Sequence, residues 1–195
     1  MLIKNDFEVA QPVEKVWKFF GNIPQVATCL PGAELTEDLG GEKYKGQVAV
    51  RMGPVRLQFA GTAEIAERDE AAKRLVLNAA GAEAKGRGQA SMVVTATLVR
   101  SGRGTKVNVT QDLQLSGAAA QYGRGMISDV TSVLMRDFAA TMQDRIERVE
   151  RGESAEQIAA SGTSSASGLA LGLRAAVMAL SRVFRRFFVP YHAAT

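Results

Sequence analysis

The chain has 195 residues, of which 46% are hydrophobic, and its formal net charge at pH 7 is +4. This length suits one domain with an appendage or a single larger domain, and the apolar fraction is enough to bury a sizeable core. Residues 1–168 carry 20 of the 24 basic side chains and all 20 acidic ones, so the excess positive charge lies in the tail. A nucleic-acid-binding domain would need a basic face with stacking aromatics on the folded body, and we therefore expect no nucleic-acid partner.

The single cysteine, Cys29, excludes an internal disulfide and fits a reducing compartment. Residues 1–6 contain no apolar run after a positive charge, so no secretory signal is expected. No stretch reaches 18 uncharged apolar residues, so no membrane-spanning helix is expected either.

The first third of the chain is expected to begin with a strand over about residues 2–10. Pro12 then opens a short helix from Val13 to Phe20, because proline is tolerated in the first turn. A second short helix is predicted from about Ile23 to Thr28. The loop over residues 29–32 is unusually apolar, which indicates packing or a partner.

From Ala33 to Ser116 apolar and polar residues alternate, which is typical of half-buried strands. Turns at Gly53-Pro54, Gly86-Arg87-Gly88 and around Gly102 divide this region into a six-strand antiparallel meander. A long helix follows from about Ala118 to Val149, with a wide apolar sector in its first half and a narrow one in its second.

This order predicts an α+β fold of the helix-grip type, in which a curved antiparallel sheet wraps around one long C-terminal helix. Small residues fall at several inward positions of the sheet: Gly46, Gly61, Ala79, Ala90 and Ala96. Small inward side chains and a wide apolar helix sector favour a ligand cavity over a filled core. Its expected lining is Trp17, Phe20, Ile23, Val26, Leu30, Pro31, Val50, Met52, Leu57, Phe59, Met92, Val94, Tyr122, Met126 and Val130.

Catalytic chemistry finds little support in the sequence. The only histidine is His192, close to the end of the chain, so no tetrahedral nitrogen and sulfur metal site and no histidine-activated nucleophile can be assembled in the domain. Cys29 is interpreted as a small buried residue at the pocket rim, and the glycine clusters as hairpin turns rather than phosphate loops. Asp112 and Tyr122 are the residues that a cavity enzyme would recruit, but we expect no enzyme, no metal and no covalent cofactor.

The end of the chain forms two further segments. Residues 151–168 are rich in Ser, Gly and Ala and are expected to be a flexible linker. Residues 169–195 are expected to contain an amphipathic helix with arginines on one side, which suits the surface of an anionic membrane. Its membrane-binding residues are Leu173, Arg174, Val177, Leu180, Arg182, Phe184, Arg185, Arg186, Phe187 and Phe188. The alternative is a helix that docks on a partner protein or on its own domain.

Several motifs within residues 1–150 together resemble the family of the carbon monoxide dehydrogenase G subunit (CoxG), which belongs to the START/Bet v 1-like superfamily. They are Val16-Trp17 to Ile23-Pro24, Cys29-Leu30-Pro31-Gly32-Ala33, the run Gly46…Gly53-Pro54…Phe59…Gly61, and Gly117…Ala120-Gln121-Tyr122-Gly123. The resemblance implies an accessory protein of a molybdenum-containing carbon monoxide dehydrogenase, linked to the association of that enzyme with the cytoplasmic membrane.

These observations lead to a first hypothesis, in which residues 1–150 bind a lipophilic ligand and the tail holds the protein on the inner face of the cytoplasmic membrane. A respiratory quinone, menaquinone or ubiquinone, is the expected ligand, because electrons from carbon monoxide oxidation must reach the respiratory chain. The second hypothesis is a membrane anchor or assembly adaptor for the dehydrogenase without ligand transport. A third, an enzyme of the cyclase or hydrolase kind, needs polar groups in the cavity that the pattern does not supply.

Overall fold

The computed structural model describes residues 1–153. The amphipathic helix predicted over residues 169–195, and all but the first residues of the predicted linker, lie outside the described residues. Within residues 1–153, no helix combines the length and the apolar character that crossing a bilayer needs.

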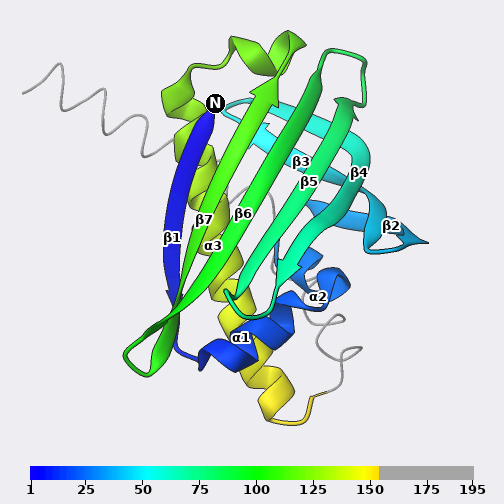
Figure 1. Cartoon of the computed structure of the whole chain (residues 1–195). Coiled ribbons are helices and arrows are strands. Elements are labelled where there is room, and N and C mark those ends of the chain that lie inside the picture. The colour runs from blue at the N-terminus through cyan, green and yellow to red at the C-terminus, as the bar shows by residue number, and fades with distance from the viewer. Residues whose placement is uncertain (154–195) are drawn as a thin grey trace, which may run out of the picture.

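The described chain folds into one seven-stranded antiparallel sheet, three α-helices and a short 3-10 helix (Figure 1). In chain order the elements are β1 (Leu2–Val9), α1 (Val13–Phe20), α2 (Ile23–Ala27), β2 (Ala33–Gly40), β3 (Lys43–Met52), β4 (Val55–Asp69), β5 (Arg74–Glu83), β6 (Gln89–Ser101), β7 (Gly104–Leu115), the 3-10 helix (Gly117–Gln121) and α3 (Arg124–Glu150). The strand order is β1-β7-β6-β5-β4-β3-β2, so the meander is continuous and β1 closes its far edge beside β7. The predicted α+β helix-grip architecture is confirmed, since the sheet curves around the single long helix α3.

Local sequence signals set the short helices at one end of the sheet. Pro12 precedes the first turn of α1, and the side chain of Asn22 accepts a hydrogen bond of 3.1 Å from the backbone N–H of Gln25 at the start of α2. Helix α1 buries Val16 and Phe20 against the core, while its Lys15 pairs with Glu150 at the end of α3. The two short helices therefore cover the end of the sheet where α3 finishes (Figure 1).

The start of the long helix differs from the prediction. Residues 117–121 form a 3-10 helix, Tyr122 and Gly123 are extended, and α3 begins only at Arg124. The backbone N–H of Ala118 donates to the carbonyl of Arg87 at 2.7 Å, which ties this segment to the turn between β5 and β6. Because that bond and the positive φ of Gly117 (66°) fix the backbone locally, the alanine-rich sequence does not extend α3 backwards.

The core consists of two separate clusters of buried side chains. The first joins α1, α2 and the second half of α3, and includes Val16, Val107 and Met142. The second joins the first half of α3 to the other end of the sheet, and includes Leu57 and Ile127. We refer to them as the α1 cluster and the Leu57 cluster; the sheet spans both.

A row of residues without side chains crosses the sheet between strands β3, β4 and β5. Gly46 pairs with Gly61, and Gly61 pairs with Gly81 in the next strand. A Cβ atom built on Gly61 would lie 1.9 Å from the carbonyl oxygen of Ala80, far inside van der Waals contact. The strands approach one another so closely here that only glycine fits, and this close approach belongs to the strong curvature of the sheet.

Candidate functional site

The inner face of the sheet, which is turned toward α3, carries apolar side chains that the helix does not fully cover. Register places these residues opposite one another on neighbouring strands: Val50 faces Leu57, Ala79 faces Met92, and Met92 faces Leu113. Most of them remain half-buried, although the ends of the same face are buried in the α1 cluster and the Leu57 cluster. We call the half-buried set the inner patch; it comprises Val48, Val50, Phe59, Leu77, Ala79, Met92, Val94, Leu113 and Leu115.

An apolar surface left accessible inside a fold is where a lipophilic molecule gains most by binding, because burial of apolar area releases roughly 25 cal/mol per Å². Small side chains contribute to this opening. Ala79 and Ala90 lie on adjacent strands of the inner face and reach less far toward α3 than their neighbours Leu77 and Met92. The predicted role of small inward residues is thus compatible with where the structure places them.

The fifteen side chains predicted to line a cavity fall into three groups by burial. Six lie in the two clusters of the core: Trp17, Phe20, Ile23, Met52, Leu57 and Val130. Eight are half-buried, and these include four members of the inner patch: Val26, Leu30, Pro31, Val50, Phe59, Met92, Val94 and Tyr122. Met126, in the first turn of α3, is 41% exposed. The structure thus brings Val50, Phe59, Met92 and Val94 together on one face, and their role in binding stays a prediction.

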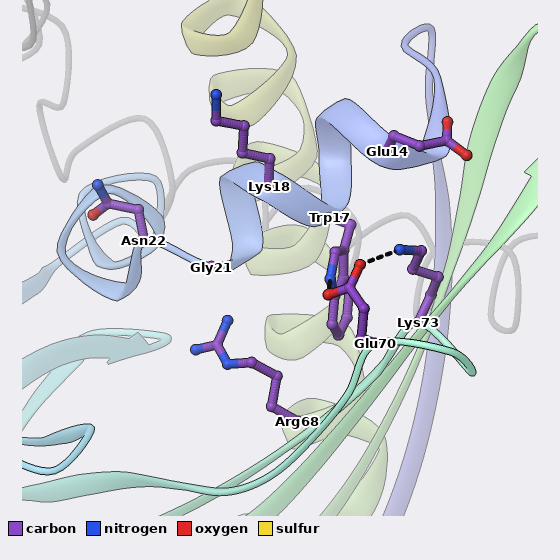
Figure 2. A pocket seen from close by; sticks show the side chains of 8 residues that line it. All are labelled: Glu14, Trp17, Lys18, Gly21, Asn22, Arg68, Glu70 and Lys73. Atoms are coloured by element: carbon purple, nitrogen blue, oxygen red, sulfur yellow. Dashed lines mark hydrogen bonds and ion pairs between the residues drawn. The ribbon is translucent and has the colours of Figure 1, made fainter.

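Trp17 also borders a second, outward-facing depression between α1 and the β4–β5 turn (Figure 2). This open pocket of about 580 Å³ is lined by Glu14, Trp17, Lys18, Gly21, Asn22, Arg68, Glu70 and Lys73. The indole N–H of Trp17 donates to Glu70, and the ammonium of Lys73 lies 5.5 Å from the centre of the indole ring. Hydrogen bonds from Lys73 and then Trp17 hold the pKa of Glu70 below its usual range. The charged lining distinguishes this pocket from the apolar inner patch.

The inner face contains polar groups that the sequence pattern did not reveal. Gln111 on β7 is only 5% exposed, and it lies between the inward-facing residues Val109 and Leu113. The alternation of β7 carried that signal, since every second residue from Val107 to Leu115 faces inward. Asp112, whose strand face was ambiguous, is exposed on the outer face and lies 3.3 Å from the amino group of Met1.

The expectation that inward positions hold no acid is wrong, because Glu83 at the end of β5 is 4% exposed. Its carboxylate pairs with the guanidinium of Arg87 at 2.8 Å and accepts hydrogen bonds from the backbone N–H groups of Lys85 and Arg87. The hydrogen bond from Arg87 is the main cause that lowers the pKa of Glu83 to about 2. All these donors belong to the following turn, so Glu83 stabilises the turn and is not available for catalysis.

Glu83→Gln is therefore expected to lower the free energy of unfolding at neutral pH and to leave it less dependent on pH in acid. The pKa of Glu83 is lower in the folded state, about 2, than the ordinary value of 4.5, so its stabilising contribution is complete above pH 4.5 and disappears as the pH falls toward 2. Urea midpoints of the two proteins measured from pH 7 to pH 2 should converge over that interval. A constant gap down to pH 2 would contradict this account of Glu83.

Cys29 follows α2 and is 1% exposed, within the α1 cluster. Burial raises the pKa of its thiol to about 11, and the nearby charge of Arg145 offsets only part of that effect. A thiol in this state is a poor nucleophile at neutral pH, because the thiolate is the reactive form. This placement agrees with the interpretation of Cys29 as a small buried residue.

The folded protein is expected to react with iodoacetamide at pH 7.5 at least about 100-fold more slowly than a free thiol, because both burial and the raised pKa of Cys29 lower the thiolate fraction at the surface. Full labelling should follow in 6 M guanidinium chloride, which serves as the control. Rapid labelling of the native protein, followed by mass spectrometry, would show that the thiol is accessible and the assignment wrong.

Metal-dependent chemistry has no evident site in residues 1–153, where no group of three His, Cys, Asp or Glu side chains is placed to hold a metal ion. The inner face of this part of the chain offers amides, hydroxyls and apolar groups, which can bind and orient a molecule. Such groups suit recognition more than nucleophilic or acid–base catalysis.

Comparison with family models decides the relationship that the sequence motifs suggested. The model of the G subunit of carbon monoxide dehydrogenase (CoxG) matches residues 6–147, which is nearly the whole described fold. The chain belongs to the CoxG family. Comparison with curated proteins gives no significant match.

Solved structures share the fold of this CoxG family member at low sequence identity. A conserved protein from Geobacillus kaustophilus superimposes with a TM-score of 0.67 at 21% identity, covering 76% of this chain and 96% of the other. The ZhuI aromatase/cyclase from Streptomyces sp. R1128 superimposes with a TM-score of 0.56 at 15% identity, covering 80% and 97% of the two chains. Ara h 8.0201 gives a TM-score of 0.52 at 16% identity, covering 75% and 97%.

These neighbours place the CoxG family member in the Bet v 1-like fold, as the helix-grip topology predicted. At identities of this order the likeness concerns the backbone alone, and one neighbour is by name an enzyme. Function must therefore be argued from the residues of the inner face and from the family, and not from the fold.

Proposed function

We propose that this member of the CoxG family is a non-catalytic accessory protein that binds a lipophilic ligand on the inner patch, between the sheet and α3. The inner patch is the observation that supports the proposal. Nine apolar residues of one sheet face keep accessible surface between two well-packed clusters. A fold that merely served as an adaptor would gain stability by closing that surface with larger side chains.

The proposed ligand is a respiratory quinone, either menaquinone or ubiquinone, and the proposed partner is a molybdenum-containing carbon monoxide dehydrogenase. Oxidation of carbon monoxide releases electrons that need an acceptor, and quinones are the acceptors dissolved in the membrane. An isoprenoid chain is long and apolar, which suits the inner patch. The family, which is named for a subunit of carbon monoxide dehydrogenase, supports the choice of partner.

The direct test is extraction of the purified full-length protein with organic solvent and analysis of the extract by mass spectrometry. We expect a quinone in the extract of the wild-type protein. Ala79→Trp would place a large side chain on the inner patch and should reduce the extracted quinone to background. Ala80→Trp is the matched control, because Ala80 lies on the same strand with its side chain on the exposed outer face.

Absence of any quinone or other lipid from the wild-type extract would overturn the proposed ligand. If in addition Ala79→Trp retained full association with the dehydrogenase in a pull-down, the protein would be an adaptor that needs no ligand. Equal loss of lipid in the Ala79→Trp and Ala80→Trp proteins would show that the inner patch is not where the ligand lies.

We also propose that residues 169–195 attach the protein to an anionic membrane surface, through four arginines that together contribute on the order of 4 kcal/mol near such a surface. Truncation after Glu153 is the suitable boundary, since Glu153 pairs with Arg148 at 2.6 Å and with Arg151 at 3.2 Å beyond the end of α3. We expect the truncated protein to remain folded and to lose co-sedimentation with phosphatidylglycerol vesicles. Equal sedimentation of the truncated and full-length proteins would contradict the membrane role of the tail.

A further inference from the structure

Two amide side chains on the inner face lack hydrogen-bond partners in the described part of the chain. Gln111 is only 5% exposed, yet its side chain makes no hydrogen bond with residues 1–153. The side-chain nitrogen of Asn5 on β1 is fully buried and has no partner among these residues either. Buried amides in native proteins are almost always paired, because an unpaired polar group away from water lowers stability.

Register places the two amides next to each other. Ile3 pairs with Gln111, and Asn5 pairs with Val109, so Asn5 and Gln111 are diagonal neighbours on the same face of adjacent strands. Diagonal positions in an antiparallel pair lie about 7–8 Å apart, which is within the combined reach of these side chains and one small group held between them. The hydroxyl of Ser132 on α3 donates to the side-chain oxygen of Asn5 at 3.2 Å, which leaves the amide nitrogen of Asn5 as the unused donor.

The surroundings of this amide pair are apolar and lie where the core divides. Val94, directly opposite Gln111 on β6, packs against the α1 cluster, whereas Leu113, the next inward residue of β7, packs against the Leu57 cluster. Both are members of the inner patch. Two polar groups thus stand at the border of the apolar surface that is proposed to bind a ligand, and not at a random place in the core.

We infer that Gln111 and Asn5 form a hydrogen-bonding site for an oxygen atom of the ligand, which is therefore an amphiphile bearing a carbonyl or similar acceptor group rather than a plain hydrocarbon. This inference rests on the proposed binding of a lipophilic ligand at the inner patch. The N–H groups of both amides donate to the oxygen, and the inner patch contacts the apolar part of the molecule. The site fixes the depth at which the polar end lies, because the nine residues of the inner patch carry no polar side chain themselves.

The test uses two compounds with the same ring skeleton, 2-methyl-1,4-naphthoquinone and 2-methylnaphthalene, of which only the first carries carbonyl oxygens. Dissociation constants of both are measured by isothermal titration calorimetry on delipidated full-length protein. The quantity compared is the ratio of the two constants in each variant, because this ratio cancels changes that affect any apolar ligand.

Gln111→Leu is expected to weaken binding of the quinone about tenfold relative to the hydrocarbon, the effect of losing roughly one buried hydrogen bond. Gln111→Met, with an unbranched chain of similar length, should give the same shift and covers the case in which leucine packs poorly. Gln114→Leu is the matched control, since Gln114 lies on the same strand with its side chain exposed on the outer face. Its ratio should equal that of the wild-type protein.

A second measurement separates a ligand site from a structural role. Removing an unpaired buried amide should leave the melting temperature of the ligand-free protein unchanged or higher, whereas removing a structural hydrogen bond would lower it. A clear decrease for both Gln111→Leu and Gln111→Met would overturn the inference.

The outcomes for the inference and for the proposed function differ. If the wild-type protein binds both compounds and the ratio is the same in every variant, Gln111 does not contact the acceptor oxygen, although the inner patch still binds apolar molecules. If neither compound binds the wild-type protein, the proposed lipophilic site fails and the inference fails with it.

Discussion

Gly61→Ala is expected to lower the free energy of unfolding by at least about 3 kcal/mol, the largest effect of any single methyl group added to this fold. The added Cβ would lie 1.9 Å from the carbonyl oxygen of Ala80 and 2.5 Å from the Cα atom of Gly81, both backbone atoms that cannot turn away. Relief would require separation of β4 from β5 at the point where Gly61 and Gly81 pair. The measurement is urea unfolding followed by circular dichroism.

Gly125→Ala is the control for this prediction, because a Cβ at Gly125 in the first turn of α3 meets nothing within 4 Å. The same chemical change should there leave stability unchanged or raise it by up to about 1 kcal/mol, since alanine favours helix. A Gly61→Ala protein within about 0.5 kcal/mol of wild type would show that the strands can separate at little cost. The result also bears on experiments at the inner patch, for which substitutions at Gly61 are unsuitable and Ala79 is the better position.

Phe138→Ala is expected to cost about 3–5 kcal/mol, which is a large part of the stability of a domain of this size. Phe138 is 8% exposed and stands at the centre of three aromatic rings from different elements. Its ring meets that of Phe7 on β1 edge-to-face at 5.9 Å and 73°, and that of Phe20 on α1 at 6.4 Å and 70°. Alanine would leave a cavity and remove both aromatic contacts, so the midpoint of thermal unfolding should fall markedly.

Met126→Ala on the same helix is the control for Phe138→Ala, because its side chain is 41% exposed. Its effect should stay within about 0.5 kcal/mol. Similar losses for the two substitutions would mean that α3 is not held mainly through the aromatic group. Met126 is also predicted to line a ligand cavity, so the same variant can be tested for lipid content by extraction.

The fold was largely predictable because the alternation of the strands is regular over more than 80 residues. Inward positions such as Val107 and Val109 followed from period two, and the turns followed from glycine and proline. The start of α3 was not predictable from local signals. Residues 118–121 favour helix by composition, but the backbone bond from Ala118 to Arg87 joins segments 31 positions apart, and no local pattern announces it.

The candidate site was predictable only in part, for a related reason. Apolar residues of the inner patch could be assigned to one face from alternation alone, as for Met92 and Val94. Glu83 continues the same alternation on β5, but a charge at an inward position is normally assigned to solvent, and its donors lie in the turn that follows. Gln111 falls on the inward phase as well, and only the three-dimensional structure shows that its amide is left without a partner in residues 1–153.

The division of the core into two clusters implies that the molecule need not open as a whole. The second half of α3 is held in the α1 cluster by Phe138 and Met142 and is tied to α1 by the pair of Lys15 with Glu150. The first half depends on the smaller Leu57 cluster, through Ile127 and Val130. Local opening requires only the free energy of the contacts that it breaks. The first turns of α3 can therefore lift from the sheet while the remainder stays folded, and such a movement gives a long molecule sideways access to the inner patch.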